Sequence, residues 1–271
     1  MSDSCSINKH ECIFFEKNVN FFIVLKKNPH RIHTPMKNIS LITIGALALT
    51  GVAASAVETS ASAGYHSRYL FRGIDFAAQE NAMADFGLDV TDSCDCGFDW
   101  YIGTWYGATT NGSPYNETDV YGGITKDFGF GSLDLGFITY TYDDGTQNDS
   151  EAYIGLSTGF AGLELGSTTY IGTGGSWKNG VYQELTASYG QEVNDAFSLA
   201  LDLGLGFAFG QAAYGPDVDG LANYSATLTG NLAISENATL SPYVSYIQNN
   251  EAWNRDTVDG FVGGVKLAFT F

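Results

Sequence analysis

Basic residues are scarce in this sequence, and so are the residue types that mark several classes of protein. The 271 residues include only 12 Lys and Arg against 30 Asp and Glu, so the net charge is −18. Binding of nucleic acid through its phosphates needs clustered Lys and Arg, and we therefore expect no nucleic-acid partner. Four cysteines are too few for a small domain held together by disulfides. Proline (5) and methionine (3) are also rare.

Glycine and aromatic residues are abundant instead. The chain has 33 Gly, 16 Tyr and 18 Phe, whereas charged residues make up only 15%. So many aromatic side chains exclude a disordered protein. Glycine and aromatic residues, with few charged helix-forming residues, favour β structure. The length allows one or two domains.

Residues 36–56 have the three parts of a secretory signal peptide. Lys37 provides the basic start, residues 39–52 form an apolar run, and residues 54–56 read Ala-Ser-Ala, a cleavage site of small residues. The run is too short for a membrane-spanning helix. We therefore predict a mature protein that begins near Val57 and acts outside the cytoplasm.

Residues 1–35 precede this signal, where a signal peptide is normally the first segment of a chain. We interpret them as an upstream extension from a start codon placed too early, with Met36 as the true start; a long basic region is the alternative. Beyond residue 56 the chain keeps six Lys and Arg, 27 Asp and Glu, two cysteines and a single histidine, His66. The expected mature net charge is −21.

Polar and apolar residues alternate from Ala61 to the C-terminus. The clearest run has apolar residues at every odd position from Phe197 to Phe207, separated by Ser, Ala, Asp and Gly. No stretch has the 3.6-residue period of a helix. We predict twelve strands, at about 61–72, 82–91, 98–108, 117–126, 132–142, 150–158, 162–171, 181–190, 196–208, 221–233, 238–248 and 259–271.

The connections between these strands alternate between short turns and longer polar loops. This alternation, with strands of about ten residues, is typical of an up-and-down β-barrel in the bacterial outer membrane, with short turns in the periplasm. An even number of strands places both chain ends on that side. The final strand ends in Phe271, which we interpret as a signal to the outer-membrane assembly machinery. A secreted β-sandwich also alternates, but it would not place Leu or Phe at every second position of nearly every strand.

One segment of the first predicted strand resembles a known family. Residues 67–73 read Ser-Arg-Tyr-Leu-Phe-Arg-Gly, and residues 103–105 read Gly-Thr-Trp. These are similar to the opening segment and the following Gly-x-Trp of the TorF-type porin family of proteobacterial outer membranes, also called Gcw_chp. The strand layout extends the resemblance over residues 60–271. It implies a barrel and a role in transport, but no particular substrate.

The residues opposite the lipid-facing positions are predicted to line the lumen, where any chemistry would take place. The predicted pore-lining residues are His66, Arg68, Arg72, Asp85, Asp89, Asp134, Glu151, Glu184, Asp202 and Lys266. Acidic rings of this kind favour cations over anions. We expect Arg68 opposite Asp89 and Arg72 opposite Asp85 in the first hairpin, as a charge ladder at the constriction. An internal salt-bridge network that fills the lumen is the alternative.

Catalytic and metal sites have little support in the sequence. His66 could form an acid–base set with Asp85 and Asp89, but no nucleophile motif accompanies it. Cys94 and Cys96 could hold a metal, yet one Cys-x-Cys is weak evidence, and a local disulfide or two thiols fits better. The acidic loop at 143–149 lacks the full pattern of a calcium loop. We therefore expect no enzyme and no cofactor.

The sequence as a whole predicts an outer-membrane barrel that passively conducts small solutes, cations or neutral molecules. Its expected partners are lipid, lipopolysaccharide, the assembly machinery and small solutes. The rival interpretation is a non-conducting structural or adhesive barrel, whose acidic loops at 109–116, 172–180 and 209–220 bind a partner. A filled lumen would favour the rival.

Overall fold

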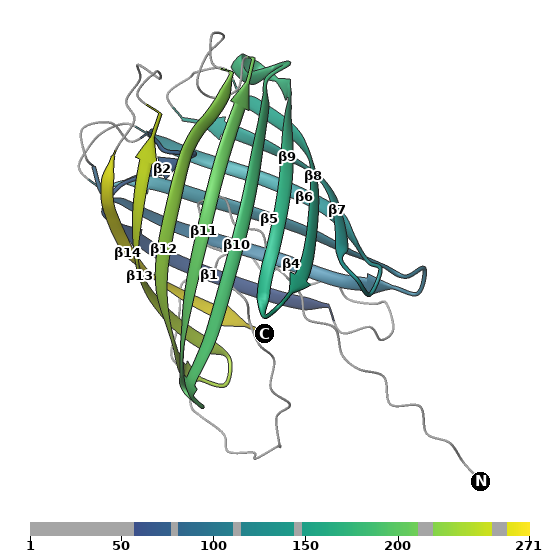
Figure 1. The fold of residues 1–271 in the computed structure, drawn as a ribbon, viewed down its shortest axis with the longest axis vertical. Helices are drawn as coiled ribbons and strands as arrows, with labels where there is room; N and C mark the ends of the chain where they lie inside the picture. The colour runs from purple at the N-terminus through teal and green to yellow at the C-terminus, as the bar shows by residue number, and fades with distance from the viewer. Residues whose placement is uncertain (1–56, 77–80, 111–114, 144–147, 211–218, 251–258) are drawn as a thin grey trace.

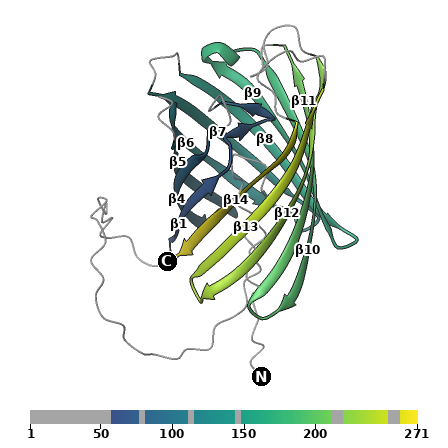
Figure 2. The same ribbon diagram turned by 90° about the vertical axis from the view of Figure 1, so that its left-hand side faces the viewer.

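The computed structural model describes residues 57–76, 81–110, 115–143, 148–210, 219–250 and 259–271. Within these ranges, twelve antiparallel strands form one closed barrel in which each strand pairs with its neighbours in sequence (Figures 1 and 2). Their bounds are β1 Glu58–His66, β4 Met83–Cys94, β5 Phe98–Thr109, β6 Asn116–Asp127, β7 Ser132–Tyr142, β8 Asp149–Phe160, β9 Leu163–Gly174, β10 Val181–Asn194, β11 Phe197–Phe209, β12 Gly220–Ser235, β13 Ala238–Asn249 and β14 Gly260–Thr270.

The first and last strands close the barrel. β1 pairs with β14 from Ser60 opposite Thr270 to His66 opposite Gly264. The backbone N–H of Phe271 donates to the carbonyl of Thr59 at 2.8 Å. Because every barrel strand has two partners, the sheet has no open edge, which is the condition for strands to cross a bilayer. The predicted twelve-stranded barrel is confirmed.

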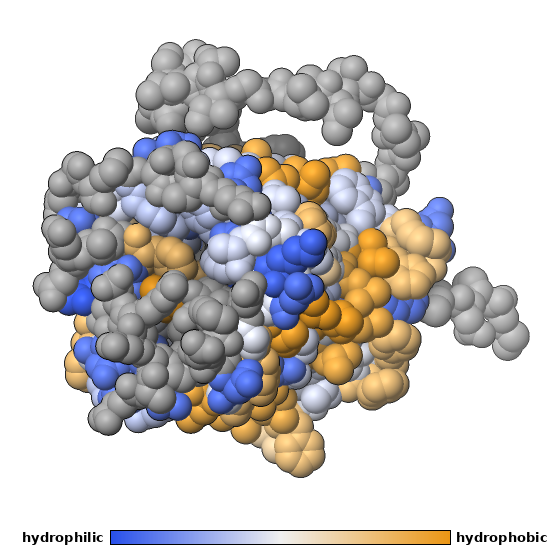
Figure 3. Space-filling view, turned by 90° about the horizontal axis from the view of Figure 1, so that it is seen from above, coloured by the Kyte–Doolittle hydropathy of each residue, from blue (hydrophilic) through white to orange (hydrophobic). Residues whose placement is uncertain are grey.

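The outer surface of the barrel is apolar, as the alternating pattern predicted. On β11, Leu199, Leu201, Leu203 and Leu205 are 37–48% exposed, whereas Asp202 between them is only 5% exposed. A soluble sandwich would bury those leucines. Figure 3 shows hydrophobic side chains along the flank of the barrel and hydrophilic ones around the end in view. Among the described residues, no helix is long and apolar enough to cross a membrane.

The two ends of the barrel differ in the length of their connections. At one end, here called the short-turn end, adjacent strands are joined at 95–97, 128–131, 161–162, 195–196 and 236–237. At the opposite, long-loop end, the connections are 67–82, 110–115, 143–148, 175–180, 210–219 and 250–259. The start of β1 and the end of β14 both lie at the short-turn end. This is the expected arrangement of an outer-membrane barrel, with the short turns in the periplasm.

The first predicted strand, at 61–72, is wrong in its second half. β1 ends at His66, and the chain then forms a separate two-stranded hairpin, β2 (Leu70–Phe71) and β3 (Ile74–Asp75). Three consecutive buried side chains, at 69–71, end the alternation of inward and outward positions. Arg72 and Gly73 follow with φ of 53° and 83°. Two positive φ values in a two-residue loop make a tight turn that matches the twist of the hairpin.

The charge ladder expected between the first two long strands is also wrong. In the structure β1 pairs with β4, and Asp85 lies opposite Gly64 while Asp89 lies opposite Ser60. Arg68 and Arg72 are not on a barrel strand, because the chain has already left the wall at His66. Arg72 is therefore positioned by the separate hairpin and not by pairing between β1 and β4.

Several predictions concern residues outside the described ranges. The upstream extension at 1–35 and the signal peptide at 36–56 both lie there, as do the central parts of the loops at 109–116, 143–149 and 209–220. They remain predictions.

The direction of the apolar face can be tested on β11 and β12. We expect Leu203→Arg, near the middle of a strand, to lower the free energy of unfolding by about 2–4 kcal/mol. Ile234→Arg, near the short-turn end of β12, should cost no more than ~1 kcal/mol, because arginine there reaches the interface. Urea titration of both variants in lipid vesicles measures the difference. Equal costs at the two positions would contradict a membrane centred on the barrel.

Candidate functional site

The hairpin β2–β3 lies inside the barrel, near its long-loop end. The tip of the hairpin lies against the inner wall. A Cβ added to Gly73 would collide with the Asn249 side chain on β13. Only glycine combines this close approach with the positive φ that the turn requires. The motif Arg72-Gly73 is therefore explained by the turn that carries the hairpin into the lumen.

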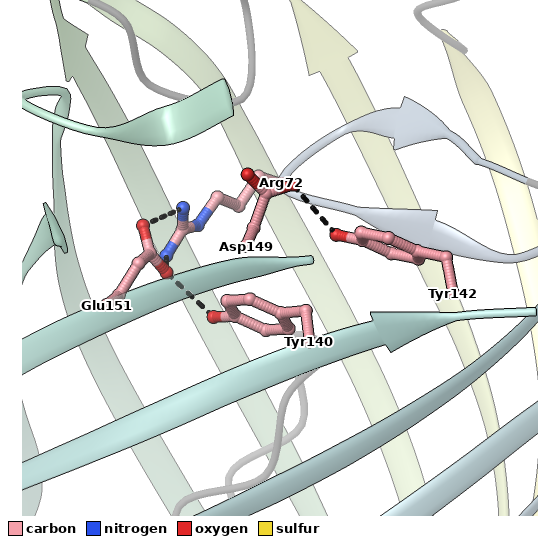
Figure 4. Close-up of polar contacts among 5 residues, drawn as sticks. All are labelled: Arg72, Tyr140, Tyr142, Asp149 and Glu151. Carbon is pink, nitrogen blue, oxygen red and sulfur yellow. Dashed lines mark hydrogen bonds and ion pairs between the residues drawn. The ribbon is translucent and has the colours of Figure 1, made fainter. Parts of the chain in front are cut away.

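Arg72 fixes the hairpin to the wall through Glu151 on β8. Its two terminal nitrogens donate to the two carboxylate oxygens at 2.9 and 2.8 Å, and the Tyr140 hydroxyl donates to the same carboxylate at 2.7 Å (Figure 4). Arg72 is 6% exposed and Glu151 1%. A parallel pair of hydrogen bonds between guanidinium and carboxylate is specific in geometry as well as strong. Removing either partner leaves the other charge buried and unpaired.

Aromatic rings surround the guanidinium of Arg72. Its central carbon lies 4.3 Å from the ring centroid of Tyr182 and 4.6 Å from those of Tyr170 and Phe71. Cation–π attraction strengthens when the charge is removed from water, as it is here. The aromatic rings therefore stabilise the same seated position that Glu151 fixes.

Trp177 completes this aromatic cluster from the loop between β9 and β10. It belongs to a short 3₁₀ helix, η1 (Gly175–Trp177), and stacks on Phe71 with ring centroids 5.7 Å apart. Asp149 holds η1 in place, since it accepts hydrogen bonds from the Ser176 and Trp177 backbone N–H groups at 2.5 and 3.2 Å. The Tyr142 hydroxyl also donates to Asp149 (Figure 4). Trp177 is therefore a buried residue of the lumen.

Tyr69 attaches the first half of the hairpin to the wall at β6. Its hydroxyl donates to Glu117 at 2.7 Å, and Tyr115 donates to the same carboxylate at 2.9 Å. The Tyr69 ring packs against Trp105 on β5. Burial and the neighbouring Glu117 carboxylate raise the pKa of the Tyr69 phenol well above its ordinary value. Tyr69 is therefore a permanent hydrogen-bond donor to Glu117.

The hairpin also contacts the opposite wall, formed by β12 to β14. The Asn223 side chain donates to the backbone carbonyl of Arg72 at 2.8 Å. Leu70 packs in a buried cluster with Ile247 and Val262. The Ser67 backbone N–H donates to the carbonyl of Gly263 at 2.8 Å. Because it is held on both sides, the hairpin crosses the lumen as a strap.

The structure places most of the predicted pore-lining residues inside the barrel. His66 on β1 contacts Asp85 at 2.9 Å and the Tyr243 hydroxyl at 2.7 Å. Tyr hydroxyls hold two other predicted acids: Tyr121 donates to Asp89, and Tyr101 donates to Asp134 at 2.9 Å. Glu184, Asp202 and Lys266 lie on the inner faces of β10, β11 and β14. Arg68 lies on the segment between β1 and β2. Whether these residues line a conducting path stays a prediction.

The lumen has two unlike walls. The wall from β4 to β9 presents carboxylates and bulky aromatic rings, such as Glu117, Asp119 and Tyr140, all at most 2% exposed. The wall from β11 to β13 presents mainly small neutral side chains, namely Ala200, Gly204, Gly206, Ala208, Asn223, Ser225, Thr227, Thr229, Ser241 and Ser245. The strap therefore packs its aromatic side chains against the bulky wall.

The lumen is also unequal along its length. Inner residues near the strap are buried, whereas inner residues toward the short-turn end, such as Asp89, Ser132, Ser157 and Ser198, are partly exposed. A Cβ on Gly190, at that end of β10, would meet no atom within 4 Å. Inner side chains are therefore more accessible to solvent toward the short-turn end than beside the strap.

The two cysteines of the short turn between β4 and β5 form a disulfide. Cys94 bonds to Cys96, which confirms the local disulfide and removes both thiols as metal ligands. The described residues contain no group of three or more His, Cys, Asp or Glu side chains arranged to hold a metal ion.

The sequence also matches a family model, over residues 50–218. The model describes the Gcw_chp family, a bacterial protein family of unknown function. The chain belongs to the Gcw_chp family. The matched range includes the strap and the strands from β1 to β11, so the motif at 67–73 is part of the shared sequence. A search of curated proteins finds no match.

Solved structures of outer-membrane channels share the fold of this Gcw_chp protein. The KdgM porin has a TM-score of 0.51 and 11% identity, over 78% of this chain and 99% of that chain. The NanC porin has a TM-score of 0.51 and 13% identity, over 78% of this chain and 98% of that chain. An outer-membrane channel from Pseudomonas putida F1 has a TM-score of 0.50 and 9% identity, over 83% and 99%. The likeness concerns the fold, and it agrees with a barrel of the bacterial outer membrane.

Sequence reasoning missed the residues that seat the strap. Tyr69, Tyr140 and Trp177 were not predicted as site residues, because one sequence does not show which aromatic side chains point into the lumen. One local signal was present: three bulky residues followed by Arg72-Gly73 interrupt the period of two. That interruption indicates a turn, and the positive φ of Arg72 confirms it.

Proposed function

We propose that this protein is a narrow diffusion channel of the outer membrane, which passes small cations and small neutral solutes. The observation that carries the proposal is the change in exposure along the lumen: inner side chains are partly exposed toward the short-turn end and buried beside the strap. Its wall of Ser, Thr, Gly and Asn side chains is wettable over most of its length. In this proposal the strap limits the size of the solutes that pass, but it does not block the lumen.

The charge of the inner wall supports cations over anions. Carboxylates at Asp85, Asp89, Asp134 and Asp202 face the lumen, while the positive charge of Arg72 is paired with Glu151. A lumen with an excess of carboxylates attracts cations and repels anions. The fold relatives are channels and not enzymes, which supports transport rather than catalysis.

A non-conducting structural or adhesive barrel is the second candidate. The observation in its favour is that the strap packs against both walls, with Tyr69 and Phe71 buried. In that case the loops at the long-loop end would carry the function by binding a partner. The assembly role of Phe271 and contacts with lipopolysaccharide belong to either candidate, and both remain proposals.

Liposome swelling separates the two candidates. Vesicles that contain the refolded protein should swell in glycerol and in arabinose, and should swell more slowly as the sugar becomes larger, because the strap limits the diameter. A matched preparation of heat-unfolded protein controls for leakage. No swelling in any solute by folded protein would support the non-conducting barrel.

A further inference from the structure

Four polar side chains form one row across the small-residue wall. Ser188 on β10 pairs with Asp202 on β11, Asp202 pairs with Thr227 on β12, and Thr227 pairs with Ser245 on β13. Paired residues of adjacent strands project from the same face of the sheet. All four are buried, between 0 and 5% exposed. The row therefore places one carboxylate among three hydroxyl groups inside the lumen.

Asp202 differs from the buried carboxylates of Asp134 and Glu151. Tyr101 donates to both oxygens of Asp134, and Arg72 donates to both oxygens of Glu151. By contrast, neither oxygen of Asp202 is in hydrogen-bonding geometry with a donor in the described part of the chain. A buried carboxylate without a partner is costly, so an occupant that supplies positive charge or a donor is expected. Ser188, directly across the pair, has a hydroxyl able to turn toward it.

The Thr227 hydroxyl presents an acceptor and not a donor to Asp202. Thr227 donates its proton to Ser245 at 2.8 Å, and its lone pairs remain available toward Asp202. A carboxylate surrounded by oxygen lone pairs is suited to a hard cation. One carboxylate with neutral hydroxyls carries a single negative charge, which matches a monovalent cation.

Access to the row is open along the same wall. Gly190 follows Ser188 by two residues on β10, so both face the lumen, and a Cβ there would meet no atom within 4 Å. Gly204, next to Asp202 on the inner face of β11, leaves room that only the Ser225 hydroxyl occupies. A cation that enters from the short-turn end would thus reach Asp202 before it reaches the strap.

We propose that Asp202, with the Thr227 and Ser188 hydroxyls, binds one monovalent cation such as K⁺ inside the lumen. The role in permeation rests on the proposed channel function, whereas binding itself does not. In a conducting barrel the site holds the cation between the open half of the lumen and the strap, so it sets both the saturation of the current and the preference for cations.

The test compares the wild type with Asp202→Asn in planar bilayers, over a series of KCl concentrations. The wild-type conductance should saturate as KCl rises, whereas the Asp202→Asn conductance should rise in proportion to KCl and its cation preference should fall severalfold. Glu236→Gln is the matched control: it removes one exposed carboxylate at the short-turn end, between β12 and β13, and should behave as the wild type. Identical saturation and selectivity in the wild type and Asp202→Asn would overturn the site while leaving the channel in place.

A second measurement does not depend on conduction. The melting temperature of the refolded wild type should be higher in KCl than in N-methyl-D-glucamine chloride of equal ionic strength, and the difference should disappear in Asp202→Asn. If that variant does not refold, Thr227→Val takes its place and should reduce the difference. A silent but folded wild type would overturn the channel alone. Equal melting temperatures of the wild type in the two salts would overturn the site.

Discussion

Replacing Arg72 with alanine should release the strap and enlarge the single-channel conductance. The change leaves Glu151 buried without its partner, at a cost of about 3–5 kcal/mol to the seated hairpin. That energy raises the population of the displaced hairpin by about 10²- to 4 × 10³-fold, since 1.4 kcal/mol is a factor of ten. The barrel itself keeps its strand pairing, because Arg72 is not part of the wall. Current steps in planar bilayers measure the change.

Two further variants test the origin of this effect. Arg68→Ala removes the same charge from the same segment and should enlarge the conductance less than Arg72→Ala does, because Arg68 is not part of the pair with Glu151. The double variant Arg72→Ala with Glu151→Gln should have no larger conductance than Arg72→Ala alone, since the effects of substituting both partners of one pair do not add. A normal conductance in Arg72→Ala, with folding verified, would show that the pair does not hold the strap.

Gly73→Ala should have an effect of similar size by a different route. Gly73 has a φ of 83°, and its added Cβ would collide with Asn249 on β13. The left-handed conformation alone costs an L-residue about 1–2 kcal/mol, and the collision adds to this cost at the seated position. We therefore expect a larger conductance and a loss of size selectivity in liposome swelling.

Gly129→Ala is the matched control for this variant. Gly129 has a φ of 82°, almost the same as Gly73, but an added Cβ would meet no atom within 4 Å. Its substitution should lower the stability by the conformational cost alone and leave the conductance normal. If both glycine variants opened the channel equally, general destabilisation would explain the effect and the close approach to Asn249 would not.

The barrel wall was predictable because lipid-facing and lumen-facing residues alternate along each strand. On β11 the alternation of Leu with small and polar residues determines which face meets lipid, and a shift of one residue would expose Asp202 to the membrane. Neighbouring strands repeat this constraint, so their number and approximate positions follow from the sequence. The strand ends were less well predicted: β10 and β12 extend to Asn194 and Ser235, beyond the expected 190 and 233.

The strap was not predictable in the same way. Its seat requires Arg72 to meet Glu151, 79 residues later in the chain, and Tyr69 to meet Glu117. No local pattern encodes either pairing. The assumption that residues 61–72 form one strand led to the wrong register, with Arg72 opposite Asp85. The bulky residues before Arg72-Gly73 were the local signal of a turn. The residues that the turn contacts come together only when the barrel closes.

We propose that a strap narrows a conducting, cation-selective lumen. Single-channel recording of the refolded protein under a KCl gradient tests this proposal. We expect small, discrete current steps and a reversal potential on the cation-selective side. Folded protein that is silent, both as the wild type and as Arg72→Ala, would contradict the account and place the function in the loops at the long-loop end.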